Sequence, residues 1–113
     1  SLVLVGLPDL IDRLVLRRNR SLYSRIHTRL NVTPLTPDDT ADYIRSRLKQ
    51  AGCDRELVTA DALAMLHEAA AGSLRDLDRL VTAAFRDAAR RKKKLVERDA
   101  ITRVVDAESR EAA

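Results

Sequence analysis

Three groups of basic side chains in the sequence could bind phosphate, and Arg75 is the first. A guanidinium is permanently charged and can donate two parallel hydrogen bonds to phosphate oxygens. Arg75 lies in the stretch GSLRDLDR at residues 72–79, within the first turn of a predicted helix. The helix macrodipole already makes that end positive, so a cation there is locally unfavourable. Arg75 therefore points at an anion, pairs with Asp76 or Asp78, or is an ordinary solvated side chain.

A second group lies in the first part of the chain and consists of Arg17, Arg18, Arg20, Arg25 and Arg29. The last two belong to the stretch SLYSRIHTRL at residues 21–30. A basic helix that merely faces water is one interpretation. That interpretation leaves unexplained why so many like charges, which repel one another, stand so close together.

The third group is the run RRKKK, formed by Arg90, Arg91, Lys92, Lys93 and Lys94. Cations at the C-terminus of a helix complement its dipole, so a solvated helix end is one interpretation. Contact with DNA is the other, because each Lys or Arg placed on a phosphate releases counterions. The sequence alone favours neither.

Other kinds of chemistry have little support in the sequence. Cys53 is the only cysteine, so an internal disulfide or a cysteine zinc site cannot form, and we expect a cytoplasmic protein. His27 and His67 lie in different predicted elements without a nucleophile beside them, and Asp38-Asp39 fits a helix cap. The phosphate-binding loop G-x-x-x-x-G-K-[ST] is absent, as is an apolar strand that ends in Asp-Glu.

The composition favours a small helical protein. Of 113 residues, 45% are hydrophobic and only 3% aromatic, so aliphatic side chains and alanine must form the core. The chain has only 3 Gly and 3 Pro, which favours helix. A net charge of +4 permits a polyanionic partner such as nucleic acid. No apolar run approaches the length of a membrane span.

Residues 1–34 predict a strand–helix–helix–strand segment. SLVLV at 1–5 is a short apolar run typical of a strand inside a parallel sheet, and LNV at 30–32 predicts a second short strand. Between them, helical patterns cover residues 9–18 and 21–30. A buried strand needs neighbours for its backbone groups, so we expect this segment to be the remnant of a larger domain.

Residues 35–113 predict a self-contained bundle of four helices with short connections. The predicted N-caps are Thr36, Thr59 and Ser73, and the predicted stops are Gly52 and Gly72. The last helix is expected to begin near Glu97. The helical spacing places on the buried faces Ala41, Ile44, Leu48, Ala51, Leu63, Leu66, Ala70, Leu74, Leu77, Val81, Ala84, Ala88, Ile101, Val104 and Val105.

The order of these elements resembles the C-terminal portion of an AAA+ ATPase. The order is apolar strand, LVGLPDL, basic stretch with SRI, second strand, PLT, four helices, and GSLRDLDRL at the start of a long helix. The likeness is to the ExeA-like branch of general secretion and to its relatives, the ATP-dependent regulators of DNA transposition. It covers nearly the whole chain and depends on order and spacing. It implies a mainly α fold, with residues 1–34 as the end of an α/β ATPase domain and 35–113 as its helical lid.

The resemblance also implies roles for two arginines. Arg75 matches the sensor 2 arginine, which contacts the γ-phosphate of ATP held by the preceding α/β domain. Arg25, in the tripeptide SRI, matches the arginine finger that enters the neighbouring subunit's ATP site, with Arg29 as the alternative. Such a finger neutralises charge on the transferred phosphoryl group. The family's polar sensor 1 position is the apolar Leu7 here, so no residue is assigned to that role.

We therefore expect a nucleotide-sensing and subunit-contacting fragment of an AAA+ ATPase linked to secretion or transposition, and not an autonomous ATPase. ATP and magnesium would be bound only in the full-length protein, and the partners would be neighbours in a homo-oligomeric ring. Two alternatives stay open. One is a basic DNA-binding module that contacts phosphates through residues 17–29 and 90–94, although we find no set of base-reading side chains. The other is a helical protein–protein adaptor.

Overall fold

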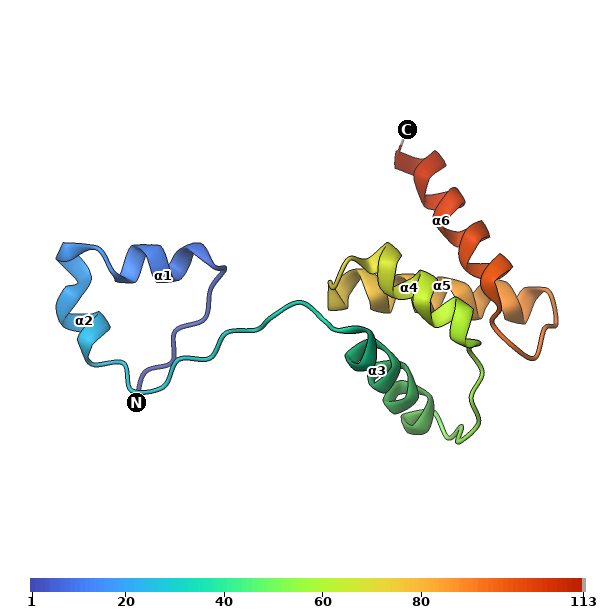
Figure 1. The fold of residues 1–113 in the computed structure, drawn as a ribbon, viewed down its shortest axis with the longest axis horizontal. Helices are drawn as coiled ribbons and strands as arrows, with labels where there is room; N and C mark the ends of the chain where they lie inside the picture. Colours follow the sequence, from blue (N-terminus) through green and yellow to red (C-terminus); the bar gives the residue numbers. More distant parts are fainter. Residues whose placement is uncertain (113) are drawn as a thin grey trace. The chain divides into compact units, whose positions relative to one another are not determined.

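The computed structural model describes residues 1–112, and these form two compact units that divide after Val32. The predicted boundary lay after Pro34. The mainly α class is confirmed, and the described part of the chain contains no sheet (Figure 1).

The first unit contains three short helical segments, which are α1 (Asp9–Leu14), the single 3-10 turn η1 (Arg17–Asn19) and α2 (Arg20–Ser24). The helix predicted over residues 9–18 therefore ends early. Leu16 has an extended backbone, with φ −59° and ψ 145°. The side-chain amide of Asn19 donates a hydrogen bond of 2.7 Å to the carbonyl of Arg13, which also accepts from the N–H of Leu16 at 3.3 Å at the end of α1.

The strands predicted at residues 1–5 and 30–32 are not formed, and this part of the prediction is wrong for the described residues. A strand can satisfy its N–H and C=O groups only against a neighbouring strand, and none is present within residues 1–112. The apolar side chains consequently remain exposed. Val5, Leu30 and Val32 each keep 90% or more of their accessible surface.

The second unit contains four helices, which are α3 (Pro37–Gln50), α4 (Ala60–Ala70), α5 (Leu74–Arg90) and α6 (Arg98–Ala112). The three predicted N-caps are confirmed, because each hydroxyl accepts a hydrogen bond from the third residue of its helix. At α3, Asp39 also accepts from the backbone N–H of Thr36 at 3.1 Å. That hydrogen bond lowers the pKa of the Asp39 carboxyl group.

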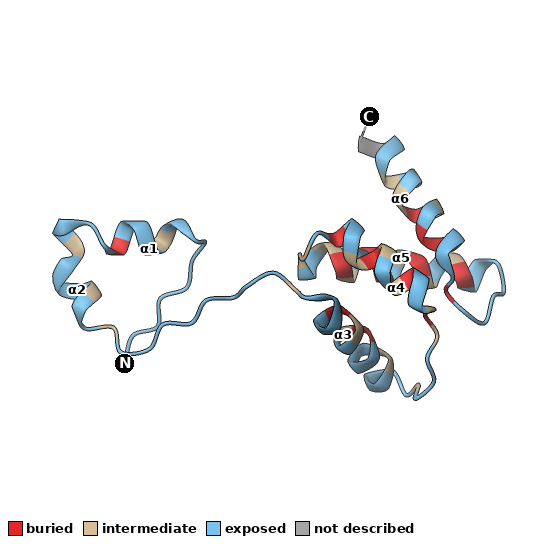
Figure 2. Ribbon diagram, in the orientation of Figure 1, coloured by how far each residue is buried: buried red, intermediate tan, exposed pale blue. Residues whose placement is uncertain are grey.

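The core of the second unit lies around α5, which packs against both α4 and α6 (Figure 2). The inward face of α5 presents Leu77, Leu80, Val81, Ala84 and Ala88. Leu74 was predicted to share this face but is half exposed. It is the first residue of α5, so no preceding turn of that helix lies beneath its side chain.

A parallel bridge between Val58 and Val96 joins two connections of the second unit. The N–H of Val96 donates to the carbonyl of Leu57 at 2.7 Å, and the N–H of Thr59 donates to the carbonyl of Val96 at 3.1 Å. Both valines are buried. The bridge therefore holds the starts of α4 and α6 side by side, a feature that helical periodicity did not predict.

The turn that ends α5 has a geometry that favours glycine, but a lysine occupies the critical position. Lys92 has φ +56°, in the left-handed region. The N–H groups of Lys92 and Lys93 donate to the carbonyls of Ala89 and Ala88, at 3.1 and 2.9 Å. These two bonds form the Schellman arrangement, which in most proteins has glycine where Lys92 lies.

Lys92→Gly is therefore expected to raise the free energy of unfolding. The left-handed conformation costs an L-residue about 1–2 kcal/mol, and the extra freedom of glycine in the unfolded chain offsets about 0.5–1 kcal/mol of that gain. Urea unfolding should show a net gain of roughly 0.5–1 kcal/mol by this difference. Lys92→Ala is the control, because it removes the same charge and keeps the strained backbone. An equal gain in both variants would contradict the account.

Candidate functional site

Arg75 lies in the first turn of α5, and a capping interaction fixes where that helix begins. The hydroxyl of Ser73 accepts a hydrogen bond of 3.3 Å from the backbone N–H of Asp76. The capped helix start is part of a packed helix and not of a loop, so the backbone that carries Arg75 is held in one conformation.

A close contact between Gly72 and the entry to α3 holds the same helix start from the other side. The N–H of Leu35 donates to the carbonyl of Gly72 at 3.0 Å. A Cβ on Gly72 would lie 2.7 Å from the Cβ of Pro34, and its φ of +81° is itself unfavourable for other residues. Only glycine fits here, and the PLT stretch is thereby joined to the base of α5.

The side chain of Arg75 is available to a ligand. It is exposed and makes no hydrogen bond or ion pair with any residue of the described chain. Its neighbour Asp76 pairs instead with Arg79, at 3.3 Å, and Arg79 also pairs with Glu108 of α6. One of the two carboxylates that could have engaged Arg75 is thus engaged elsewhere.

The second of those carboxylates, Asp78, is also engaged. It accepts a hydrogen bond of 2.7 Å from the hydroxyl of Tyr43 and lies 3.9 Å from the guanidinium of Arg47. The hydrogen bond to Asp78 raises the pKa of the Tyr43 hydroxyl, and partial burial adds to the effect. These contacts join α3 to α5 and leave Arg75 without a local partner.

The two candidates for an arginine finger differ in availability. The helix predicted over residues 21–30 ends at Ser24, so Arg25 is the C-cap of α2, and its exposed side chain has no partner among residues 1–112. Arg29 donates a hydrogen bond of 3.4 Å to the carbonyl of Tyr23. Its guanidinium also lies 4.2 Å from the centre of the Tyr23 ring, a cation–π contact. Arg25 is therefore the freer of the two.

The residues predicted to contact nucleic acid fall into both units. Arg17, Arg18 and Arg20 belong to the first unit, and the run at 90–94 belongs to the second. All are exposed. Within the described chain, Arg91 alone among them forms an ion pair, with Asp87 at 3.4 Å.

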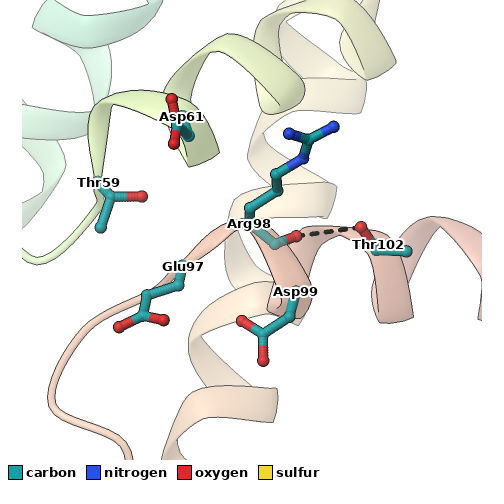
Figure 3. Close-up of a pocket in the computed structure, with 6 residues that line it drawn as sticks. All are labelled: Thr59, Asp61, Glu97, Arg98, Asp99 and Thr102. Atoms are coloured by element: carbon teal, nitrogen blue, oxygen red, sulfur yellow. Dashed lines mark hydrogen bonds between the residues drawn. The ribbon is translucent and has the colours of Figure 1, made fainter.

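A shallow hollow at the N-terminal ends of α4 and α6 was not predicted (Figure 3). It is lined by Thr59, Asp61, Glu97, Arg98, Asp99 and Thr102. Most of its polar atoms serve the helices themselves. Thr59 caps α4, Thr102 donates to the carbonyl of Arg98 at 3.1 Å, and Asp99 pairs with Arg103 at 3.0 Å. Acidic side chains here complement two positive helix ends, so the hollow has a structural explanation.

The chain is similar to the general secretion pathway protein A of Aeromonas hydrophila, with 37% identity over 89 residues. The match covers 75% of this chain but only 16% of that protein. It supports, at a distance, the secretion branch of the resemblance. No profile of a known protein family matches the chain, and no solved structure matches it.

Two further findings concern the described residues. No helix in that part of the chain is both long and apolar enough to cross a membrane. No three His, Cys, Asp or Glu side chains within residues 1–112 are grouped so that they could hold a metal ion.

The two arginines at the start of α5 should differ in their effect on stability. Arg75→Ala is expected to leave the thermal midpoint of this chain unchanged or slightly raised, because it removes an unpaired cation from a positive helix end. Arg79→Ala breaks two half-exposed ion pairs and should cost up to about 1 kcal/mol. Thermal unfolding monitored by circular dichroism measures both. A larger loss for Arg75→Ala would show that Arg75 is a structural residue.

Proposed function

We propose that this chain forms the nucleotide-sensing and subunit-contacting part of an AAA+ ATPase of the general-secretion branch. Arg75 would be its sensor 2 residue and Arg25 its arginine finger. The single observation that carries the proposal is the state of Arg75, an exposed arginine on a fixed helix start that is unpaired within the described residues, while Arg79 one turn on is paired. The distant match to a general secretion pathway protein is the independent support.

The chemistry of Arg75 fits the phosphate end of a nucleotide. A guanidinium with free donors can form charge-assisted hydrogen bonds to a phosphate, and each is worth about 1.5–3 kcal/mol. Bound ATP supplies the phosphoryl group, and bound magnesium offsets its negative charge. The phosphate loop and the magnesium ligands would come from the α/β domain, because the sequence here has no such loop. The residues of this chain would bind and report the nucleotide.

Arg25 would act on a different subunit. It lies outside the second unit, at the end of α2, and has no intramolecular partner within the described residues. A guanidinium of this kind, placed beside a neighbour's nucleotide, stabilises charge that develops during phosphoryl transfer. Arg29 is held by Tyr23 and would have to leave that contact before it could take the same role.

In the full-length ATPase, Arg75→Ala should lower the rate of ATP hydrolysis while leaving the helical unit folded. Loss of a charge-assisted hydrogen bond of about 1.5–3 kcal/mol corresponds to roughly a ten- to hundredfold effect. Arg79→Ala is the matched control and should be milder, because its guanidinium is already used within the chain. The 113-residue chain alone serves as the blank and should show no turnover. A normal ATPase rate for Arg75→Ala would exclude the sensor role.

Arg25→Ala should abolish ATP hydrolysis, and mixing the variant with subunits that keep the finger but lack a working phosphate loop should restore part of the rate. A subunit without the finger keeps its own nucleotide site, so it should regain activity beside a subunit with an intact finger and an inactivated phosphate loop. Each variant alone should be inactive, and the mixture should recover part of the rate. Arg29→Ala should resemble the wild-type protein. Failure of the mixture to recover activity, with ring assembly intact, would count against a finger that acts in trans.

A further inference from the structure

The exposed face of α5 carries a line of four arginines, called here the arginine stripe, which consists of Arg75, Arg79, Arg86 and Arg90. Their spacing is i, i+4, i+11 and i+15 in one uninterrupted helix. At 100° per residue, the four positions fall within about 60° of one another around the helix axis. All four are exposed, on the side away from the aliphatic core.

The stripe is long and continues beyond the helix. At 1.5 Å per residue, Arg75 and Arg90 are separated by about 22 Å along the axis. The helix then ends in the Schellman turn, after which the exposed chain presents Lys92, Lys93 and Lys94. Cations therefore follow one another from the first turn of α5 to the connection before α6.

Most of these cations are not neutralised within the chain. Arg79 pairs with Asp76 and Glu108, but Arg86 and Arg90 form no ion pair with any residue that the structure describes. Lys92 and Lys94 are likewise unpaired within residues 1–112.

Two neighbouring acids pair with cations that do not belong to the stripe. Asp87 accepts from Arg91 at 3.4 Å and from Arg103 at 2.7 Å. Asp99 has a lowered pKa, chiefly through its hydrogen bond from Arg103 and to a lesser degree through the charge of Lys93. The acids of α5 and α6 thus leave the stripe itself largely uncompensated.

The side chains between the arginines argue against insertion of this face into a membrane. Amphipathic helices that lie on membranes insert large apolar side chains beside their cations. The exposed residues between Arg75 and Arg90 include Thr82 and Ala89 but no large apolar side chain, and Leu74 and Leu95 lie outside the stripe. An arginine stripe without large apolar side chains beside it is the kind of surface that binds a hydrated polyanion.

We propose that the arginine stripe and the adjacent lysines bind the phosphate backbone of duplex DNA. Duplex DNA carries one charge per about 1.7 Å of axis, both strands counted, so a length of duplex equal to the stripe carries about 13 phosphates, of which those on one side can meet it. Guanidinium groups match phosphate geometry better than ammonium groups do, and phosphate contacts carry no sequence information. The surface therefore binds DNA without sequence preference. This inference goes beyond the proposed ATPase role, because Arg79, Arg86, Arg90 and the adjacent lysines have no part in that role, and only Arg75 is shared with it.

The test uses this whole chain and Arg86→Ala/Arg90→Ala. Both positions are exposed, and alanine favours helix, so the variant should fold, as circular dichroism will show. The control is Lys49→Ala/Arg55→Ala, which removes the same charge from exposed side chains off the stripe. Fluorescence anisotropy with a labelled duplex of about 20 base pairs is recorded from about 50 to 200 mM salt. Arg75 is left intact, so the outcome is independent of the proposed sensor role.

The stripe variant should bind at least tenfold more weakly at about 50 mM salt, and its slope of log K against log salt should fall by about 1.8. The control should bind within about twofold of the wild-type chain. Equal loss of DNA affinity in both variants would show that binding depends only on the net charge of the chain, and it would overturn the proposal. So would the absence of DNA binding at low salt. Binding to phosphatidylserine vesicles that is lost only in the stripe variant, without DNA binding, would assign the surface to lipid instead.

Discussion

The second unit depends on the division of α5 into two faces. One face buries five aliphatic side chains between α4 and α6, and the opposite face carries the arginine stripe. Both follow from the same 3.6-residue period, so neither can shift without the other. A helix that rotated to bury an arginine would place an unpaired charge in an aliphatic core, which is costly. The packing of the core thus fixes the direction in which Arg75, Arg86 and Arg90 point.

The ends of α5 are held by different means. At its start, Gly72 lies against Pro34 and Ser73 caps the first turn. At its end, Lys92 takes a left-handed conformation that closes the helix without glycine. The start of α5 is therefore a fixed backbone with a guanidinium that has no partner among residues 1–112, and such a residue can respond to an anion without altering the fold.

Much of the second unit could be predicted from sequence because its helix signals are local. Thr36, Thr59 and Ser73 act within a single turn, and the structure shows all three as caps. The strand predicted at residues 1–5 was wrong because a strand forms only when another segment pairs with it, and the local sequence does not show whether such a segment is present. The bridge between Val58 and Val96 escaped prediction for the same reason.

The candidate site likewise combines local features, which the sequence predicts, with contacts between distant residues, which it does not. The sequence predicted that Arg75 lies in the first turn of a helix. Whether its guanidinium forms an ion pair depended on which groups Asp76 and Asp78 contact instead. Asp78 is engaged by Tyr43, a residue of another helix, and Asp76 shares Arg79 with Glu108. The pairing of Asp76 with Arg79 follows the i, i+3 spacing of a helix, but no spacing rule relates Asp78 to Tyr43 or Arg79 to Glu108. The preference for Arg25 over Arg29 likewise rests on a contact with Tyr23 that only the fold reveals.

The bridge between Val58 and Val96 has a consequence for how the second unit assembles. Its two hydrogen bonds close a loop that contains both α4 and α5. Closing a loop of this length costs roughly 3 kcal/mol in chain entropy, whereas two hydrogen bonds contribute only about 1–3 kcal/mol. The bridge therefore cannot nucleate folding and forms only after α4 and α5 have packed and brought its ends together. Because the bridge requires α4, α5 and the start of α6 to be in place together, these three helices are expected to unfold together.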